Sequence, residues 1–415
     1  MKKVIVLLML VGLVAGIAQA QTPQVRLVWE KTFTEGIRSF TLGEIDSLAP
    51  PEVTVVGSFK GRADQRILRI DTAGTMREVL TKRYNDPVIL SHNGKYIGVN
   101  RWVYDPEYRN LPLPYVITPS GGRIGLQGEC GSCEIAAISN DGQVILVAKG
   151  LGYPVEAGQI STKRETLVFY DARGQVINEV LASEYLAFDE HGEDRGKRLS
   201  PNGGYLALRQ WVSKNPAKFS LGLYDGRGRK LWETDEDVGA QAGFEVSEEG
   251  TVAVGYFRSD STGGVKFYRR DGSLLGDLNL GSKIGATQIT FSPDERYALA
   301  KCVRSVGVQV TPFGESLLLL AVNPPRIIWR RDLPVHGRDK KLGFYGLDFS
   351  SNGGYVAVFA WDIGYGTGYA ALYDLTNREL WHVDLQVGGT VRITPSGRYL
   401  LLQQGNQLKL YKIER

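Results

Sequence analysis

The stretch Arg198-Leu199-Ser200-Pro201-Asn202-Gly203-Gly204-Tyr205-Leu206-Ala207-Leu208 contains two short apolar runs on either side of a Ser-Pro-Asn-Gly turn. Alternating apolar residues around a reversal that needs Asn or Gly at positive φ predict a β-hairpin. The pattern recurs at residues 89–100, 137–148, 244–256, 289–302, 347–360 and 391–403. The turns are marked by Ser91, Ser139, Ser200, Ser247, Ser292, Ser350 and Thr394, at steps of 44 to 61 residues. Such a period is typical of a four-stranded propeller blade.

Each hairpin is followed by a second pair of strands with its own turn. Residues 167–177 and 221–232 show the form most clearly: the third strand ends in Tyr-Asp, and the fourth often carries Leu-Trp. We name the four strands A, B, C and D. One such sheet cannot bury both of its faces alone, so we predict an all-β fold in which like blades are stacked in a ring.

The two ends of the chain predict how the ring closes. Leu27-Val28-Trp29-Glu30 resembles a D strand, whereas residues 406–411 resemble a C strand with no D strand after it. We therefore expect residues 25–33 to complete the last blade. Residues 37–80 have strand patterns without the Ser-Asn-Gly turn and are predicted to form a degenerate blade, which makes eight blades. Seven is the alternative, if that stretch is a capping insertion. The remaining blades are predicted at residues 86–127, 133–181, 195–235, 241–280, 285–333, 343–385 and 390–415.

The first twenty residues have the pattern of an export signal. Lys2 and Lys3 precede the apolar run of residues 4–17, and Ala18-Gln19-Ala20 has the small residues of a cleavage site. Cleavage would release a propeller domain of residues 21–415, starting at Gln21, into the periplasm or outside the cell. We see no second apolar run long enough to span a membrane.

The charge balance argues against a polyanionic partner. The chain has 49 basic and 45 acidic residues, and loss of Lys2 and Lys3 would leave 47 against 45, a net charge of +2. Binding to nucleic acid or to an anionic membrane needs a concentrated basic surface. We therefore expect a protein, peptide or envelope-polymer partner and a monomeric protein.

The units resemble the WD40-like and quinoprotein-like propeller repeats of exported bacterial proteins over nearly the whole mature chain. The Tyr-Asp pairs at residues 170–171, 224–225 and 373–374 stand where WD40 repeats carry Trp-Asp, although the Gly-His pair of that family is absent. Residues 228–232 and 377–381 are similar to the Gly-Lys-x-x-Trp motif by which quinoprotein blades interlock. The resemblance implies a propeller and does not identify a ligand.

The A–B and C–D turns are short and alike, whereas the connections expected at the opposite end are long and differ from one another. We predict those B–C and D–A connections at residues 101–114, 149–165, 181–197, 210–219, 302–316 and 361–368. Irregular loops on a regular scaffold commonly carry binding residues. We call the end of the ring that carries these connections the loop end. The candidate binding residues there are aromatic or basic: Trp102, Tyr104, Trp211, Phe257, Arg258, Trp361 and Tyr365. The alternative is that Trp102, Trp211 and Trp361, which recur in register, fill the wedge between blades. Packing between blades is the role we expect of Trp29, Trp232, Trp329 and Trp381.

Cys130-Gly131-Ser132-Cys133 has the spacing of a redox motif, but no helix is expected beside it. In an exported protein we interpret Cys130 and Cys133 as a structural disulfide that closes a loop. Cys302 is left as an odd thiol. The acidic loop around His191 lacks the spacing of a calcium site, so we interpret it as a solvated loop.

No catalytic residue, metal ligand set or cofactor site is predicted. The sequence lacks the adjacent cysteines of quinoprotein dehydrogenases and the Asp boxes of sialidases. We therefore expect a non-enzymatic recognition protein that binds through its loop end. The alternatives are a quinoprotein-like or carbohydrate-active enzyme with its site at the propeller axis, and a purely structural spacer.

Overall fold

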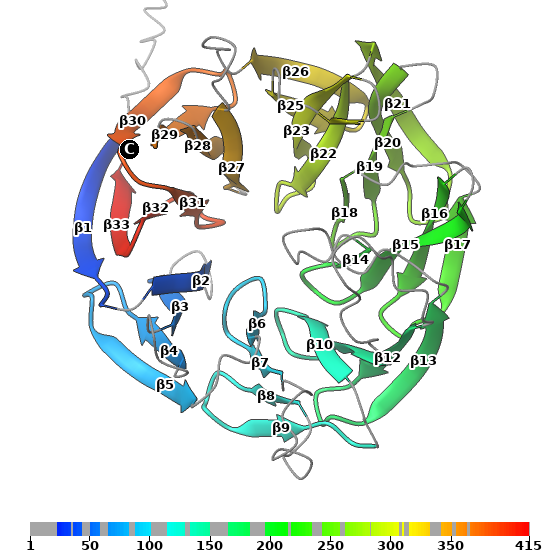
Figure 1. The fold of residues 1–415 in the computed structure, drawn as a ribbon, viewed down its shortest axis with the longest axis horizontal. Coiled ribbons are helices and arrows are strands. Elements are labelled where there is room, and N and C mark those ends of the chain that lie inside the picture. The colour runs from blue at the N-terminus through cyan, green and yellow to red at the C-terminus, as the bar shows by residue number, and fades with distance from the viewer. Residues whose placement is uncertain are drawn as a thin grey trace, which may run out of the picture.

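The chain folds into eight antiparallel sheets arranged in a ring around a central axis (Figure 1). This computed structural model describes residues 23–34, 36–43, 50–58, 65–82, 88–100, 114–128, 133–149, 165–182, 196–214, 217–234, 243–257, 262–282, 284–306, 309–310, 315–332, 342–350, 354–362 and 366–414. Across these ranges the secondary structure consists of strands, and no helix is long and apolar enough to cross a bilayer.

Each blade contains four strands in the order A, B, C, D, with A nearest the axis and D on the outer rim. Blades 1 to 4 comprise β2 (Gly36–Gly43), β3 (Glu52–Ser58), β4 (Gln65–Ile70) and β5 (Met76–Lys82); β6 (Val88–Leu90), β7 (Ile97–Val99), β8 (Tyr115–Ile117) and β9 (Arg123–Gly125); β10 (Cys133–Ile138), β11 (Ile145–Lys149), β12 (Glu165–Tyr170) and β13 (Val176–Ala182); and β14 (Lys197–Leu199), β15 (Tyr205–Lys214), β16 (Ala217–Asp225) and β17 (Lys230–Thr234).

Blades 5 to 8 repeat this order. They comprise β18 (Phe244–Val246), β19 (Val252–Phe257), β20 (Thr262–Tyr268) and β21 (Leu274–Ser282); β22 (Ile284–Phe291), β23 (Tyr297–Val306), β25 (Ser316–Val322) and β26 (Pro325–Asp332); β27 (Leu342–Phe349), β28 (Tyr355–Asp362), β29 (Thr367–Asp374) and β30 (Glu379–Leu385); and β31 (Gly389–Ile393), β32 (Tyr399–Gln404), β33 (Gln407–Glu414) and β1 (Gln24–Thr32). Blade 6 also carries the short strand β24 (Gln309–Val310), which pairs with β23.

The ring closes through its two ends. β1 pairs antiparallel with β33, from Gln24 opposite Glu414 to Thr32 opposite Gln407. Phe33 N extends the pairing by donating to Asn406 O at 2.9 Å. The predicted closure and the predicted count of eight blades are therefore confirmed, and the seven-blade alternative is wrong because the stretch without the turn motif forms blade 1.

Apolar residues are buried on both faces of the inner strands because each sheet is covered by a neighbour on either side. One cluster joins Leu319 and Trp329 of blade 6 to Leu347, Val358 and Tyr373 of blade 7. The outer D strands are half exposed: β21 alternates exposed and partly buried residues along most of its length. Packing between blades therefore holds the ring together.

Three of the connections predicted to be irregular are partly regular strand pairs. Residues 210–214 and 217–219 belong to the paired strands β15 and β16, with Trp211 opposite Phe219. Residues 302–316 include the extension of β23 and its pairing with β24, and Trp361 pairs with Gly368. The prediction was wrong at these three connections because strand pairing continues into segments whose lengths and sequences differ from blade to blade.

Candidate interaction surfaces

Each A–B turn that carries the motif is built around a buried serine or, in blade 8, around the buried Thr394. Ser200 Oγ donates to Asn202 Oδ1 at 2.8 Å and accepts the backbone N–H of Tyr205 at 3.0 Å. The same two bonds are made in the turns marked by Ser91, Ser139 and Ser292. These bonds lie within six residues, which explains why the motif recurs so clearly in the sequence.

Neighbouring A–B turns are also joined to one another. A series of hydrogen bonds connects the turns of blade 2 through blade 6. The bonds are Asn93 N to Asn140 Oδ1 (2.8 Å), Asn140 N to Pro201 O (2.6 Å), Asn202 Nδ2 to Glu248 O (3.0 Å) and Glu249 N to Glu295 Oε1 (2.8 Å). We call the end of the ring that carries the A–B and C–D turns the turn end. Its polar groups therefore hold adjacent blades in register.

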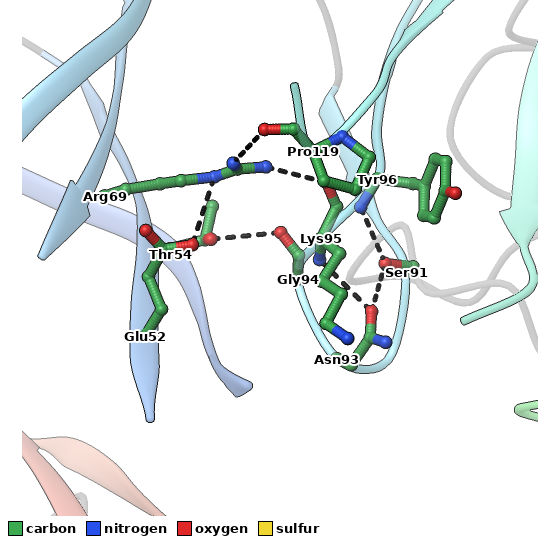
Figure 2. A network of polar contacts seen from close by, with 9 residues as sticks. All are labelled: Glu52, Thr54, Arg69, Ser91, Asn93, Gly94, Lys95, Tyr96 and Pro119. Atoms are coloured by element: carbon green, nitrogen blue, oxygen red, sulfur yellow. Dashed lines mark hydrogen bonds and ion pairs between the residues drawn. The ribbon is translucent and has the colours of Figure 1, made fainter. Parts of the chain in front are cut away.

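Blade 1 lacks the Ser-x-Asn-Gly sequence, and a buried arginine joins it to blade 2 (Figure 2). Arg69 of β4 donates from Nη2 to Lys95 O at 2.7 Å and from Nη1 to Pro119 O at 2.9 Å. Its Nε lies 3.6 Å from Glu52 Oε2. Because Lys95 follows the A–B turn and Pro119 lies in the C–D turn, this one side chain contacts both turns of blade 2.

Loss of hydration in this site affects the guanidinium of Arg69. Burial lowers its pKa, the nearby carboxylate of Glu52 acts in the opposite direction, and Arg77 lowers the pKa further. An arginine side chain stays charged in proteins, so the carbonyl oxygens and Glu52 must compensate that charge. A second contact beside it, from Thr54 Oγ1 to Gly94 O at 3.0 Å, strengthens the same seam.

Charged side chains gather around the axis on the innermost strands. Two residues before each Ser or Thr mark, the A strand has a partly exposed or exposed residue. In blades 4, 5, 7 and 8 these residues are Arg198, Glu245, Asp348 and Arg392. The carboxylate of Asp348 accepts the N–H of Phe349 at 2.9 Å and that of Ile393, in the next blade, at 3.0 Å. The Asp348 carboxylate therefore accepts two backbone N–H groups of innermost strands, at the strand edges that do not pair with strand B.

The pKa values of two groups report these surroundings. The pKa of His92, in the A–B turn of blade 2, is lowered mainly by loss of hydration; Asp348 acts in the opposite direction, and Arg392 lowers it further. The pKa of Glu245 is raised by burial, which outweighs the opposing effect of Arg198. His92 is thus within electrostatic reach of Asp348 and Arg392, and Glu245 is within reach of Arg198. Within the described ranges no group of three His, Cys, Asp or Glu side chains could hold a metal ion.

Two of the predicted binding residues lie at blade seams on the loop end. Phe257 ends β19, and its ring covers Gly285 of blade 6 so closely that a Cβ there would lie 2.5 Å from it. Trp361 stacks on Phe359, with ring centroids 6.4 Å apart and an angle of 20°, and it borders Gly388 between blades 7 and 8. Both side chains remain partly exposed. They therefore pack against the next blade and still present part of a ring to solvent.

The other predicted site residues are not brought together by the described part of the chain. Trp211 is placed as a strand residue of β15, and its side chain lies outside what the structure describes. Trp102, Tyr104, Arg258 and Tyr365 also lie outside the described residues. Their role at the loop end stays a prediction.

The cysteines differ in their state. Cys133 at the start of β10 is disulfide-bonded and buried, whereas Cys130 lies outside the described residues. Cys302 is a free thiol that is fully buried, and burial raises its pKa to about 12. A thiol in that state is a poor nucleophile at neutral pH.

Sequence reasoning missed Arg69 and the charges around the axis. Arg69 occupies the position where other blades have Phe169, Leu223, Phe267 and Leu372, all buried. The available signal was an arginine at a C-strand position that is apolar in these other blades. The axial residues share one offset from the turn serine, which an alignment of the blades would also have revealed.

The comparisons with known proteins support the fold. The C-terminal WD40 domain of Sif2 matches with a TM-score of 0.56 and 12% identity, over 94% of this chain and 99% of that one. The Dos1 propeller matches with a TM-score of 0.52 and 11% identity, over 94% and 95% of the two chains. No protein-family model matches the sequence, and no curated protein matches it. The chain is thus a WD40-like β-propeller in fold.

Proposed function

We propose that this protein is an exported, non-enzymatic β-propeller that recognises a protein, a peptide or an envelope polymer. In this proposal residues 1–20 direct export, and the mature protein starts at Gln21 in the periplasm or outside the cell. Recognition uses the loop end of the ring, where the B–C and D–A connections lie.

The difference between the two ends of the ring supports this proposal. At the turn end, side-chain and backbone groups already bond from blade to blade. At the loop end, Phe257 and Trp361 keep part of their rings exposed beside connections that differ from blade to blade. Aromatic residues with one packed and one exposed face are frequent anchors in protein interfaces.

The test starts from capture of a partner on immobilised protein from an envelope extract, followed by titration calorimetry with the purified partner. We expect Phe257→Ala and Trp361→Ala each to weaken binding by about tenfold or more. Leu274→Ala is the matched control, because Leu274 is 50% exposed on the outer rim near a C–D turn. Trp361→Phe retains an aromatic ring and should bind more tightly than Trp361→Ala. Unchanged affinity of both alanine variants, with thermal unfolding preserved, would exclude this surface.

The charges at the axis favour a second candidate. Asp348 and Arg392 lie on the innermost strands of blades 7 and 8, and the carboxylate of Asp348 accepts the N–H of Ile393 beside Arg392 at 3.0 Å. A quinoprotein-like or carbohydrate-active enzyme would bind its ligand at this axis. A thermal shift with pyrroloquinoline quinone and calcium, or with a glycan panel, would support this candidate. Loss of the shift in Arg392→Ala would locate the ligand at the axis.

A further inference from the structure

A groove crosses the outer rim between blades 3 and 4. It has a volume of about 530 Å³ and is lined by Ile177 and Asn178 of β13 and by Arg227 and Arg229 of the β16–β17 turn. The volume is in the range of sites that bind small ligands or short segments. Asn178 fixes the two walls relative to each other, because its Nδ2 donates to Arg227 O at 3.0 Å.

One wall of the groove is an exposed apolar strand edge. Val176 and Ile177 are 46% and 38% exposed, and Leu231 of the neighbouring D strand is 44% exposed. Among the described strands, β13 is the last of its sheet and pairs only with β12. An outer strand with apolar residues beside it is a template on which an extended chain can pair.

The other wall is cationic. Arg229 is 73% exposed and is held by Asp225, whose Oδ2 accepts from its Nε at 2.7 Å. The second oxygen of Asp225 accepts the backbone N–H groups of Arg227 and Arg229, both at 2.9 Å. Within the described residues, the side chain of Arg227 has neither a hydrogen-bond nor an ion-pair partner.

The carboxylates near the groove are already engaged. Glu179 pairs with Lys149 at 3.1 Å, and Glu233 pairs with Lys230 at 2.6 Å while it accepts from Ser220 at 2.7 Å. Burial raises the pKa of Asp225, but the hydrogen bonds that it accepts outweigh this effect and lower the pKa. Asp225 therefore stays ionised and paired with Arg229. Arg227 is exposed and its side chain is available to a carboxylate of a bound molecule.

We propose that this rim groove binds an extended acidic peptide segment. An aliphatic residue of the segment lies over Ile177, and a carboxylate pairs with Arg227. The backbone of the segment runs along the outer edge of β13, where Asn178 Oδ1 already accepts the N–H of Glu179 at 2.9 Å. A polyanion without apolar groups is disfavoured because the exposed apolar residues Val176, Ile177 and Leu231 would have no counterpart in it. The proposal is independent of the loop end.

Fluorescence anisotropy with three labelled hexapeptides tests the proposal on the whole protein. The probes alternate Glu with Val, Lys with Val and Glu with Ser. We expect the Glu-Val peptide to bind saturably, with a dissociation constant of up to about 1 mM. This binding should weaken with added salt. The other two peptides should bind at least about tenfold more weakly. Absence of saturable Glu-Val binding, or equal binding of all three, would overturn the proposal.

Variants locate the site. We expect Arg227→Glu and Ile177→Ser each to weaken Glu-Val binding by about tenfold. Arg326→Glu is the control, since Arg326 is an exposed arginine near the start of β26 in blade 6 and does not line the groove. Thermal unfolding confirms that the variants fold. Equal losses in Arg227→Glu and Arg326→Glu would indicate general charge attraction. Heparin that displaces the peptide and binds equally well to Ile177→Ser would assign the groove to polyanions.

Discussion

Arg69 shows how one residue can replace a packing contact with a polar one. In four other blades this position carries a buried Phe or Leu. In blade 1 the side chain instead bonds to two carbonyl oxygens of blade 2, Lys95 O and Pro119 O, at 2.7 and 2.9 Å. Blade 1 lacks the serine turn, so the long side chain of Arg69, which reaches both turns of blade 2, joins the two blades instead.

Truncation of this arginine should be costly. We expect Arg69→Ala to lower the free energy of unfolding by about 2–4 kcal/mol, because two carbonyl oxygens and Glu52 lose their partner. Arg66→Ala, on the same strand, removes an exposed ion pair with Glu78 and should cost less than about 1 kcal/mol. Urea unfolding measures both, and similar costs would contradict a special role for Arg69.

Turns are the elements that set the geometry between blades. Gly203 has φ 73°, and a Cβ there would lie 2.7 Å from the Cβ of Ser139 in blade 3. Gly121 also has a positive φ, 88°, but a Cβ there would have no neighbour within 4 Å. Substitutions at these two glycines therefore distinguish the cost of backbone strain alone from the added cost of the close approach between neighbouring blades.

We expect Gly121→Ala to lower the free energy of unfolding by about 1 kcal/mol, the cost of a left-handed conformation. Gly203→Ala should cost at least about 1 kcal/mol more, because the blades must also move apart. Urea unfolding at one pH gives the comparison. If the two variants cost the same, the turns of blades 3 and 4 do not depend on this contact.

Turn carboxylates make stability depend on pH. The pKa of Asp225 and that of Asp374 are lowered in the folded state, because hydrogen bonds from turn N–H groups and arginines outweigh burial. Their stabilising contribution is therefore present above the unfolded pKa of about 3.9 and is lost as the pH falls through the lower folded value. We expect the unfolding free energy to drop below about pH 4 and to drop less in Asp225→Asn. A profile unchanged by that substitution would contradict this assignment.

Glu245 should act with the opposite sign. Burial raises its folded pKa, so the folded state binds the proton more readily and stability falls as the pH rises through that value. We expect Glu245→Gln to gain stability relative to the parent protein as the pH rises from 4 to 7. Urea titrations at several pH values measure this difference, and a constant difference would refute the expectation.

At the scale of the whole molecule, stability depends on closure of the ring. β1 contributes the outer strand of blade 8, and Trp29 on that strand donates to Asp71 O of blade 1 at 3.2 Å. The first strand therefore contacts both the last blade and the first. Opening the ring here would expose the edge of β33 and one face of each neighbouring blade.

Removal of β1 tests the closure. A chain that starts at Phe33 should melt about 10 °C or more below one that starts at Pro23, with a broader transition because neighbouring blades uncouple. A synthetic peptide of residues 24–32, added in trans, should restore part of the loss. Calorimetry measures the transitions, and equal melting temperatures would show that the other blades hold the ring without the closing strand.

The sequence alone determined the repeat, the four-stranded unit, the closing strand and eight as the preferred blade count. The serine turns repeat as a local hydrogen-bonded unit of six residues, and strand alternation is local as well. Such features leave the same mark in every copy, which is why they can be recognised without coordinates.

The tertiary structure decided the Arg69 seam, the charges at the axis, the rim groove and the hairpins in place of three predicted loops. Arg69 bonds to groups 26 and 50 residues away, and Asn178 is joined to Arg227 across 49 residues. Contacts between blades depend on how the sheets are rotated about the axis. No local pattern records that rotation, so residues from different blades meet only once the ring has formed.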